Sequence, residues 1–385
     1  MKHPGRGLLY ATGMVVILNA GAVTAQAPEQ PAAAPPEDTV RVLAESIRRQ
    51  VVPFLDGTYV FVNFPQDGIR FEADIQPNFV IRQSFSDQLT TDAVLDERKV
   101  VKAYSIVGTP RVRLRMFNAR SAPVRTPSYM PKGSFTEIFL RGERLASANH
   151  QARVGLWALQ ATVGHHSNGH DGCLFTTDEL IDGECVGAPD LSKINKTDGS
   201  FSTNFVRIGG RYRREWLRDI TSAEQQEVCR DPAKRDQCFE EQIGVREYTI
   251  GFDVQQHFHT DERVKPFYGT TRFELSFSGA VRFKRVCQSR ARATATLYYV
   301  GAPPDGVGPL AFQGEGACTF TDEGGWGAFV RFYTGQDYYN LGFADSITRF
   351  MVGAHFEQDG FLRFLSRPAK NLLEQEKARR RKTGE

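Results

Sequence analysis

The chain has 385 residues, of which 24% are charged and 11% are aromatic, and its formal net charge is +3 at pH 7. This composition is typical of a folded protein and excludes a wholly disordered one, while so small a net charge argues against a nucleic-acid-binding protein. The length exceeds that of one ordinary helical domain and suits a single large all-β barrel.

The N-terminal segment has the pattern of a secretory signal peptide. A basic start precedes an apolar run from about Leu8 to Val23, and small residues at Val23 and Ala25 occupy the positions that a signal peptidase reads. The sequence therefore predicts a signal peptide over residues 1–25, with a membrane-anchor helix as the alternative. No later stretch reaches the roughly 18 apolar residues of a spanning helix, so the mature chain is expected to be exported without one.

The next segment, residues 26–57, is predicted to be a periplasmic linker followed by a short N-terminal segment. Residues 27–38 read APEQPAAAPPED and supply almost no side chain that a packed core could use. Residues 39–55 could hold a short helix.

From residue 58 onward the hydrophobic pattern has a period of two. In residues 272–284, apolar side chains occupy odd positions from Phe273 to Phe283, and most even positions are charged or hydroxyl-bearing. Such alternation indicates strands with one apolar and one polar face. The other segments of this kind, some of them weaker, are residues 111–117, 153–168, 202–213, 247–258, 291–300, 326–333 and 347–356.

A soluble sandwich would also alternate, but two features favour a membrane barrel. Several of these segments run to ten or more residues, the length that a tilted strand needs to cross the hydrocarbon, whereas ordinary strands average about five or six. The polar faces also carry many charges, as a barrel interior can. Together with the export signal, the pattern predicts an antiparallel transmembrane β-barrel in the outer membrane over residues 58–361, followed by a basic C-terminal tail over residues 362–385.

Six cysteines are consistent with export to an oxidising compartment. They fall into three pairs that are close in sequence, which favours local disulfides, although six cysteines allow other connectivities. No CxxC spacing occurs, so a zinc site is not expected. The predicted pairs are Cys173–Cys185, Cys229–Cys238 and Cys287–Cys318.

The stretch GHHSNGHDG, residues 164–172, ends one of the predicted strands. The odd positions of residues 153–168 are apolar until they reach His165 and Ser167, so these two side chains are expected to face lipid, while His166 faces the interior. Residues two apart on a strand lie roughly 7 Å apart, which lets a serine oxygen reach an imidazole nitrogen. Serine needs such a base to become a nucleophile, and the base works best when a third group holds its tautomer.

Asn204 can supply that third group. In residues 202–213 it shares a face with Val206 and Ile208, which is the apolar and therefore outward face. An amide oxygen can accept from the imidazole N–H without placing a second charge against lipid. The pattern by itself is equally compatible with a polar loop at the membrane edge.

A resemblance adds to this interpretation. The segment from Gly164 to Gly169, followed by SFSTN at residues 200–204, resembles the active-site signature of the outer-membrane phospholipase A family. Residues 135–140 and the region from Thr334 to Phe361 also resemble that family, so that the similarity covers most of residues 98–361, faintly outside the motif.

The resemblance implies a twelve-stranded barrel with its site on the outer wall, dependent on calcium and activated by dimerisation. It implies that Ser167 is the nucleophile, His165 the general base and Asn204 the group that orients it. It further implies that the Gly169 N–H contributes to an oxyanion hole and that a calcium-bound water is the second donor. The implied calcium ligands are the His170 carbonyl, Ser200 and a residue of the partner subunit, for which Ser121 is the candidate here.

Two features depart from the family pattern. An insert with Cys173 and Cys185 enlarges the loop between the motif and Asn204, which puts the calcium requirement in doubt. The basic tail after Phe361 would contact anionic lipid headgroups or a periplasmic partner, or form a solvated disordered extension.

The sequence thus predicts a calcium-dependent outer-membrane phospholipase that hydrolyses acyl esters of glycerophospholipids through a Ser-His-Asn mechanism. Its partners would be membrane phospholipids and a second copy of the chain, with no role for nucleic acid. The alternatives are a barrel without catalysis, either a pore or a structural protein, and a soluble secreted esterase.

Overall fold

The computed structural model describes residues 56–64, 69–85, 100–117, 124–147, 150–219, 242–260, 262–281, 287, 290–320, 325–339 and 341–356. Several sequence predictions lie outside these residues: the signal peptide, nearly all of the linker, Ser121, the Cys229–Cys238 pair and the basic tail.

The described residues form strands with only short helical turns. None of the described helices is long and apolar enough to cross a bilayer. The strands are β1 (Thr58–Phe64), β2 (Ile69–Ile75), β3 (Phe79–Phe85), β4 (Val101–Thr109), β5 (Val112–Phe117), β6 (Val124–Tyr129), β7 (Lys132–Ser147), β8 (His150–Ser167), β9 (Glu179–Ile181), β10 (Glu184–Val186), β11 (Ser202–Asp219), β12 (Gln242–Phe258), β13 (Thr271–Val281), β14 (Arg290–Gly301), β15 (Leu310–Thr319), β16 (Trp326–Gln336) and β17 (Ser346–Phe356). The turns are a 3₁₀ turn η1 (Leu191–Lys193) and a helical turn α4 (Lys265–Tyr268).

Three pairs of consecutive strands are the two halves of one long, interrupted strand. Pro77 separates β2 from β3, Pro110 separates β4 from β5, and Pro131 separates β6 from β7. Proline has no N–H to donate to the ladder, so a strand breaks or bends where one occurs. The register continues across each break, since β2 pairs with β5 while β3 pairs with β4.

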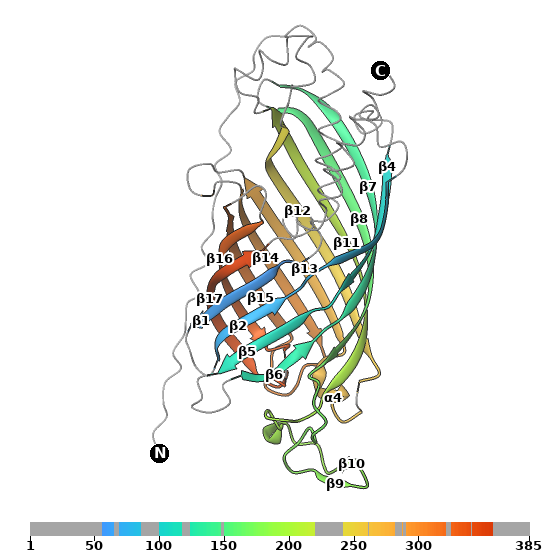
Figure 1. Ribbon diagram of the computed structural model, residues 1–385, viewed down its shortest axis with the longest axis vertical. Coiled ribbons are helices and arrows are strands. Elements are labelled where there is room, and N and C mark those ends of the chain that lie inside the picture. Colours follow the sequence, from blue (N-terminus) through green and yellow to red (C-terminus); the bar gives the residue numbers. More distant parts are fainter. Residues whose placement is uncertain are drawn as a thin grey trace, which may run out of the picture. The chain divides into compact units, whose positions relative to one another are not determined.

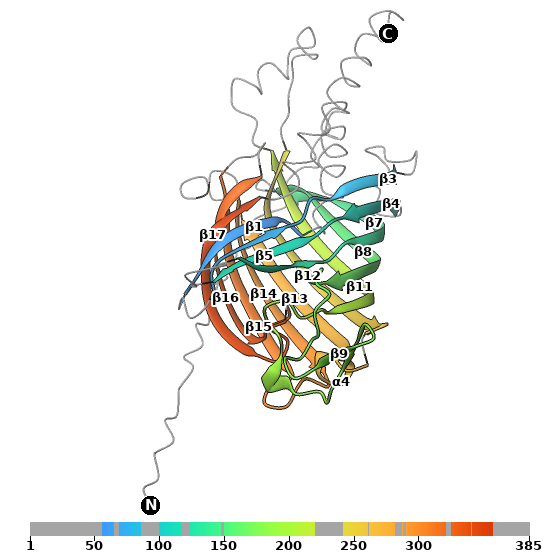
Figure 2. The ribbon, with the colours of Figure 1, turned by 60° about the horizontal axis from the view of Figure 1, so that its bottom comes forward.

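When each pair is counted as one strand, the described residues form a closed, twelve-stranded antiparallel barrel. Each strand pairs with the next along the chain, and β1 closes the ring by pairing with β17 from Thr58↔Phe356 to Phe64↔Phe350. The small β9–β10 hairpin stands outside this sheet. Figures 1 and 2 show β7, β8, β11 and β12 as neighbours in the wall, with β9 and α4 beyond one end of it. The predicted all-β barrel is confirmed.

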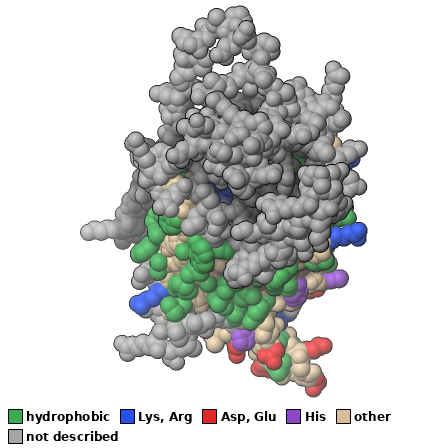
Figure 3. Space-filling view, turned by 45° about the horizontal axis from the view of Figure 1, so that its top comes forward, with side chains coloured by type: hydrophobic (Ala, Val, Ile, Leu, Met, Phe, Trp, Pro, Cys, Tyr) green, Lys and Arg blue, Asp and Glu red, His purple; other side chains and the backbone are tan. Residues whose placement is uncertain are grey.

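The two faces of the wall have opposite polarity. Apolar side chains such as Trp157, Leu275 and Phe277 are exposed on the outside, and Figure 3 shows hydrophobic side chains gathered on the face in view. Inward positions hold charges that pair across strands, for example Arg113 with Glu72 at 2.8 Å. Closure leaves no sheet edge to satisfy around the ring, and alternation turns every second side chain outward, a pattern that fits a membrane barrel.

We call the end of the barrel where β8 ends and β11 begins the site end. Three connections meet there: the β8–β11 connection, the β12–β13 connection and the β16–β17 connection. They share one apolar cluster, which we call the cap core, and β16–β17 lies on the opposite side of the ring from β8–β11. These connections therefore cover the site end. The buried residues of the cap core are Leu174, Phe175, Ile194, Phe201, Val264, Tyr268, Leu341 and Phe343.

Two of the predicted disulfides are present. Cys173 is bonded to Cys185 inside the β8–β11 connection, and Cys287 in the β13–β14 connection is bonded to Cys318 near the end of β15. Both close short stretches of chain, as their local spacing suggested.

Candidate functional site

The candidate site lies on the outer wall, on the last residues of β8 and the first residues of β11. His165 stands directly across the ladder from Asn204, and Ser167 stands across from Ser202. The residues that precede His165 on the same face are exposed, Trp157 by 59% and Val163 by 60%. Their inward neighbours His166 and Thr203 are each 0% exposed. The polar side chains thus end an apolar, outward row, as the alternation predicted.

The imidazole of His165 is oriented by the Asn204 amide. Nδ1 of His165 donates to Oδ1 of Asn204 at 2.8 Å. Because an amide oxygen has no proton to give, this bond places the imidazole proton on Nδ1 and leaves Nε2 as the acceptor. An unprotonated Nε2 is what a general base needs.

Ser167 is on the same face but is not joined to the base. Among the described residues its hydroxyl has no hydrogen-bond partner, and its main chain lies opposite Tyr129, the last residue of β6. The serine hydroxyl and the imidazole therefore share an outward face without being hydrogen-bonded to each other. Catalytic hydrogen bonds are often long in a free enzyme and tighten when substrate binds.

Gly164 at the start of the motif is required by a close approach. It faces the interior, and a Cβ at this position would lie 2.3 Å from the Phe205 ring. Phe205 is the cross-strand partner of Gly164 and is buried. The glycine leaves room for the Phe205 ring on the inner face of β8, next to the His165–Asn204 pair in the ladder.

Gly169 has the geometry of a turn that exposes its amide. Its φ is +70°, a left-handed conformation that favours glycine, and a Cβ there would lie 2.9 Å from the Tyr129 ring. No hydrogen bond to the Gly169 N–H occurs within the described chain, so this donor is available to a developing oxyanion.

The turn is fixed by the side chain of Asn168, which is 1% exposed. Its Oδ1 accepts from the Phe201 N–H at 2.9 Å, and its Nδ2 donates to the Gly199 carbonyl. The Ser200 N–H donates in turn to the Gly172 carbonyl at 2.7 Å. Residues 168–172 and 199–201 are therefore held side by side, although a long insert separates them in sequence.

The predicted calcium ligands lie on these two clasped segments. His170 is exposed and Ser200 is partly exposed, and each is in the middle of its segment. A main-chain carbonyl and a hydroxyl are oxygen donors of the kind that calcium takes. Two such donors leave most of a calcium coordination sphere to water or to a second chain. Ser121, the candidate for a ligand from the second chain, lies outside the described residues. The described residues contain no cluster of three or more His, Cys, Asp or Glu side chains that would hold a metal without them.

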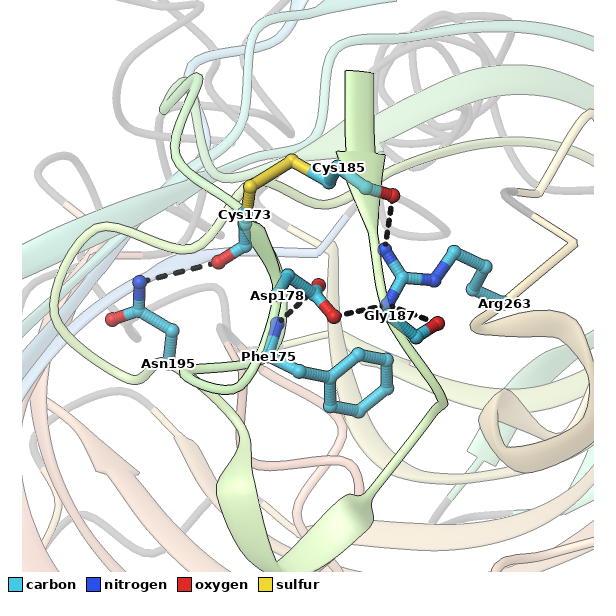
Figure 4. Close-up of a disulfide and its surroundings, with 7 residues drawn as sticks. All are labelled: Cys173, Phe175, Asp178, Cys185, Gly187, Asn195 and Arg263. Carbon is cyan, nitrogen blue, oxygen red and sulfur yellow. Dashed lines mark hydrogen bonds and ion pairs between the residues drawn. A yellow bond between two sulfur atoms is a disulfide. The ribbon is translucent and has the colours of Figure 1, made fainter. Parts of the chain in front are cut away.

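The insert is braced at several points, as Figure 4 shows. Besides the Cys173–Cys185 bond, Arg263 of the β12–β13 connection donates to the carbonyl of Cys185 at 2.9 Å and pairs with the Asp178 carboxylate. Asp178 also accepts from the N–H of Phe175 at 3.2 Å, which joins this ion pair to the cap core. The insert is therefore a folded element, and the turn at residues 168–172 is formed despite its presence.

Sequence reasoning did not find the residues that lie beneath the site. His166 was assigned to the interior, but its partner Tyr268 is 102 residues away and is joined to it at 2.9 Å. The signal was a tyrosine in a short segment, KPFYG, with no motif around it. Contacts between distant loops leave no periodicity that a sequence shows.

Fold and site together define a twelve-stranded barrel whose apolar outer wall carries a serine two residues from an oriented histidine. No family model and no curated protein matches the chain. Among solved structures, the outer membrane phospholipase A from Escherichia coli matches with a TM-score of 0.40 and 9% identity, over 80% of this chain and 96% of that one. A Salmonella typhi outer membrane phospholipase dimer with bound calcium matches with a TM-score of 0.36 and 10% identity, over 78% and 90%. These likenesses are too remote to carry a functional argument, which rests on the residues of the site.

Proposed function

We propose that this protein is an outer-membrane phospholipase that hydrolyses acyl ester bonds of glycerophospholipids. The observation that carries the proposal is the hydrogen bond from His165 to Asn204 on the outward face, with Ser167 two residues further along that face. Three polar side chains at the edge of an apolar wall do not stabilise a barrel in hydrocarbon, so their presence argues for a chemical role.

Each residue has a distinct task in the proposed reaction. Nε2 of His165 takes the Ser167 hydroxyl proton while the serine oxygen attacks the ester carbonyl. His165 then returns the proton to the leaving alcohol, and an acyl-enzyme remains on Ser167. A water molecule, deprotonated by the same nitrogen, releases the fatty acid. Asn204 holds the imidazole throughout, and the Gly169 N–H donates to the oxyanion.

The position of the site along the wall favours a phospholipid substrate. Below His165 the outward row is apolar, and beyond Ser167 the chain enters a polar loop with His170 and Asp171 exposed. The site therefore lies at the border between hydrocarbon and headgroups. The ester bonds of a glycerophospholipid occupy the same level of a bilayer, so the substrate needs little displacement to reach Ser167.

We further propose that calcium binds between His170 and Ser200, with the carbonyl of the former and the hydroxyl of the latter as ligands. Bound there, calcium would supply positive charge and a polarised water close to the oxyanion. Since two protein oxygens do not fill its coordination sphere, a second copy of the chain is proposed to complete the site, which would make the dimer the active form.

The alternative of a pore is opposed by the contents of the lumen. Asp337 and Tyr339, from the β16–β17 connection, bind Arg115 and Arg111 of the β4–β5 strand, with an Arg115–Asp337 distance of 2.7 Å. The lumen retains a cavity of about 390 Å³, lined largely by paired arginine and carboxylate side chains. The cap core covers the site end. A conducting channel would need both features removed.

The test uses the full mature chain refolded in detergent and measures fatty acid release from a diacyl phospholipid. Wild type should hydrolyse the lipid and Ser167→Ala should not, at equal folded fraction. The same assay with excess chelator, and with calcium restored, examines the metal proposal separately. Hydrolysis that survives Ser167→Ala would overturn the serine mechanism, and wild type without hydrolysis in either condition would favour the barrel without catalysis.

A further inference from the structure

The inner side of the site has its own pair of residues. His166 lies between His165 and Ser167 on β8, and Thr203 precedes Asn204 on β11. The two are cross-strand partners, and both are fully buried. Any movement of either side chain is therefore transmitted through one peptide unit to the residues proposed to do the chemistry.

Both inner residues are bonded to the same connection, the one between β12 and β13. Nδ1 of His166 and the hydroxyl of Tyr268 form a hydrogen bond of 2.9 Å. The hydroxyl of Thr203 is 2.7 Å from that of Thr260. One connection thus fixes the ends of both site strands from below, at two separate points.

Tyr268 belongs to the cap core and is itself immobilised. It is fully buried, and its ring centroid lies 4.9 Å from that of Phe201 and 5.6 Å from that of Phe343. Gly269, which ends α4, has a φ of +71° that lets the chain turn back at once into β13. Burial raises the pKa of Tyr268 well above its ordinary value, so the phenol stays protonated.

The ring of His166 is packed as well as bonded. It meets Phe201 edge to face at a centroid distance of 5.2 Å, and Tyr338 lies at 5.2 Å on another side. These partners come from the insert and from the β16–β17 connection, so all three connections of the cap touch this one side chain. Nε2 of His166 is buried with no hydrogen-bond partner among the described residues, so the Tyr268 bond is the polar contact that orients the ring.

We propose that His166 and Tyr268 are positioning residues that hold the end of β8 in register, so that Ser167 and His165 keep the separation that proton transfer needs. This inference rests on the proposed function. It assigns the cap a task beyond covering the lumen, because the cap sets the geometry of a site on the opposite face of the wall.

The physical reason is that Ser167 is the last paired residue of its strand. Its neighbours are Ser202 on one side and only Tyr129 on the other. Strand ends fray unless side-chain contacts hold them, and a displacement on the order of 1 Å between reacting groups can cost about a hundredfold in rate. Asn168, bonded to Phe201 and Gly199, holds the chain one residue after the nucleophile, and a fixed His166 holds it one residue before.

The experiment compares Tyr268→Phe, which removes only the hydroxyl, with Tyr298→Phe, which removes a phenol hydroxyl elsewhere in the lumen. Tyr268→Phe should lower kcat by roughly tenfold with KM unchanged, and Tyr298→Phe should change neither. His166→Asn, whose side-chain amide can replace Nδ1 in the bond to Tyr268, should retain more activity than His166→Leu. Equal kcat in wild type and Tyr268→Phe, or an equal fall in both tyrosine variants, would overturn the proposal.

A second measurement separates this inference from the proposed function. Amide hydrogen exchange at residues 165–168 should become faster in Tyr268→Phe and stay at the wild-type rate in Tyr298→Phe, whether or not the protein hydrolyses lipid. If exchange accelerates but Ser167→Ala is as active as wild type, the proposed function fails and the anchoring of β8 remains. If exchange is unchanged in Tyr268→Phe, the proposal that His166 and Tyr268 hold the end of β8 is wrong.

Discussion

Asn204 lies directly opposite His165 in the β8–β11 ladder, and its side-chain oxygen accepts the imidazole Nδ1–H at 2.8 Å. The pair is neutral, which suits its place on a wall that faces hydrocarbon, because a carboxylate in the same position would lose its hydration without a counter-ion. Asn204→Ala should lower kcat by about 10- to 100-fold and leave residual activity, as expected for an orienting bond worth roughly 1.4–2.7 kcal/mol. Initial rates at saturating lipid measure this loss, and an unchanged rate would remove Asn204 from the mechanism.

Ser167→Ala should abolish hydrolysis, and His165→Ala should be comparably severe, because nucleophile and base act as a unit. Ser202→Ala is the matched control, since Ser202 is directly across the ladder from Ser167. It should keep nearly all activity. Rates are compared in one detergent at equal folded fraction. If Ser202→Ala were inactive and Ser167→Ala active, the nucleophile would lie on β11 and the assignment to Ser167 would be wrong.

Gly164→Ala should destabilise the barrel by about 1–3 kcal/mol, because its Cβ would meet the Phe205 ring at 2.3 Å. Gly133→Ala is the control, as nothing lies within 4 Å of a Cβ at that position on the adjacent strand. Urea or thermal unfolding followed by circular dichroism measures the difference. Gly164→Ala with Phe205→Leu should recover part of the loss, and equal stability of the two single alanine variants would contradict the close approach.

Replacing Cys173 and Cys185 by serine should loosen the insert and leave the barrel folded. A disulfide that closes so short a loop contributes on the order of 2–3 kcal/mol to the part that it constrains, whereas barrel strands satisfy their own backbone bonds. Limited proteolysis should then cut within residues 173–200, with an unchanged far-ultraviolet spectrum. A loss of barrel spectrum would show that the insert is required for folding.

Ser200→Ala should raise the calcium concentration needed for half-maximal activity, because it removes one of the proposed oxygen ligands. Ser192→Ala in the same insert is the control, since the Ser192 hydroxyl is exposed and bonds to Asp190 at 2.7 Å. Calcium titrations of activity and of thermal stability provide two readouts. Activity that is unaffected by a strong chelator would contradict the metal proposal for this chain.

The sequence was sufficient to predict the long strands and the orientation of the site. A wall with lipid on one side and a charged lumen on the other imposes a strict period of two, which is visible in β8, β11, β12 and β13. The short strands β1 to β3 were not individually predicted, because each has only seven residues, too few for an alternation to show clearly. The cap core was not predicted either, because its residues lie in connections where no regular alternation of apolar and polar residues occurs.

Within the site, the part that the sequence indicated is the part carried by neighbouring strand positions. Side chains alternate between the two faces along a strand, and this alternation turns His165, Ser167 and Asn204 outward. The contact of His166 with Tyr268 depends on how a loop of α4 folds over the barrel mouth, and no local rule fixes that. The predicted roles of Ser121 and of the Cys229–Cys238 pair remain predictions, since these residues lie outside the described part of the chain.

The three proline interruptions lie on adjacent strands, and the last of them borders the site. The Pro131 carbonyl accepts from the His165 N–H at 2.9 Å, and beyond this bond β8 retains a single pairing on that side, between Ser167 and Tyr129. The sheet is thus irregular beside the nucleophile, because β6 and β7 pair with β8 on either side of the Pro131 break. In the proposed function, a lipid reaches Ser167 from the outer wall by lateral diffusion in the leaflet, without leaving the bilayer. Turnover should then follow the mole fraction of substrate in the surface, and diluting the lipid with inert detergent should slow hydrolysis even when its bulk concentration is held constant.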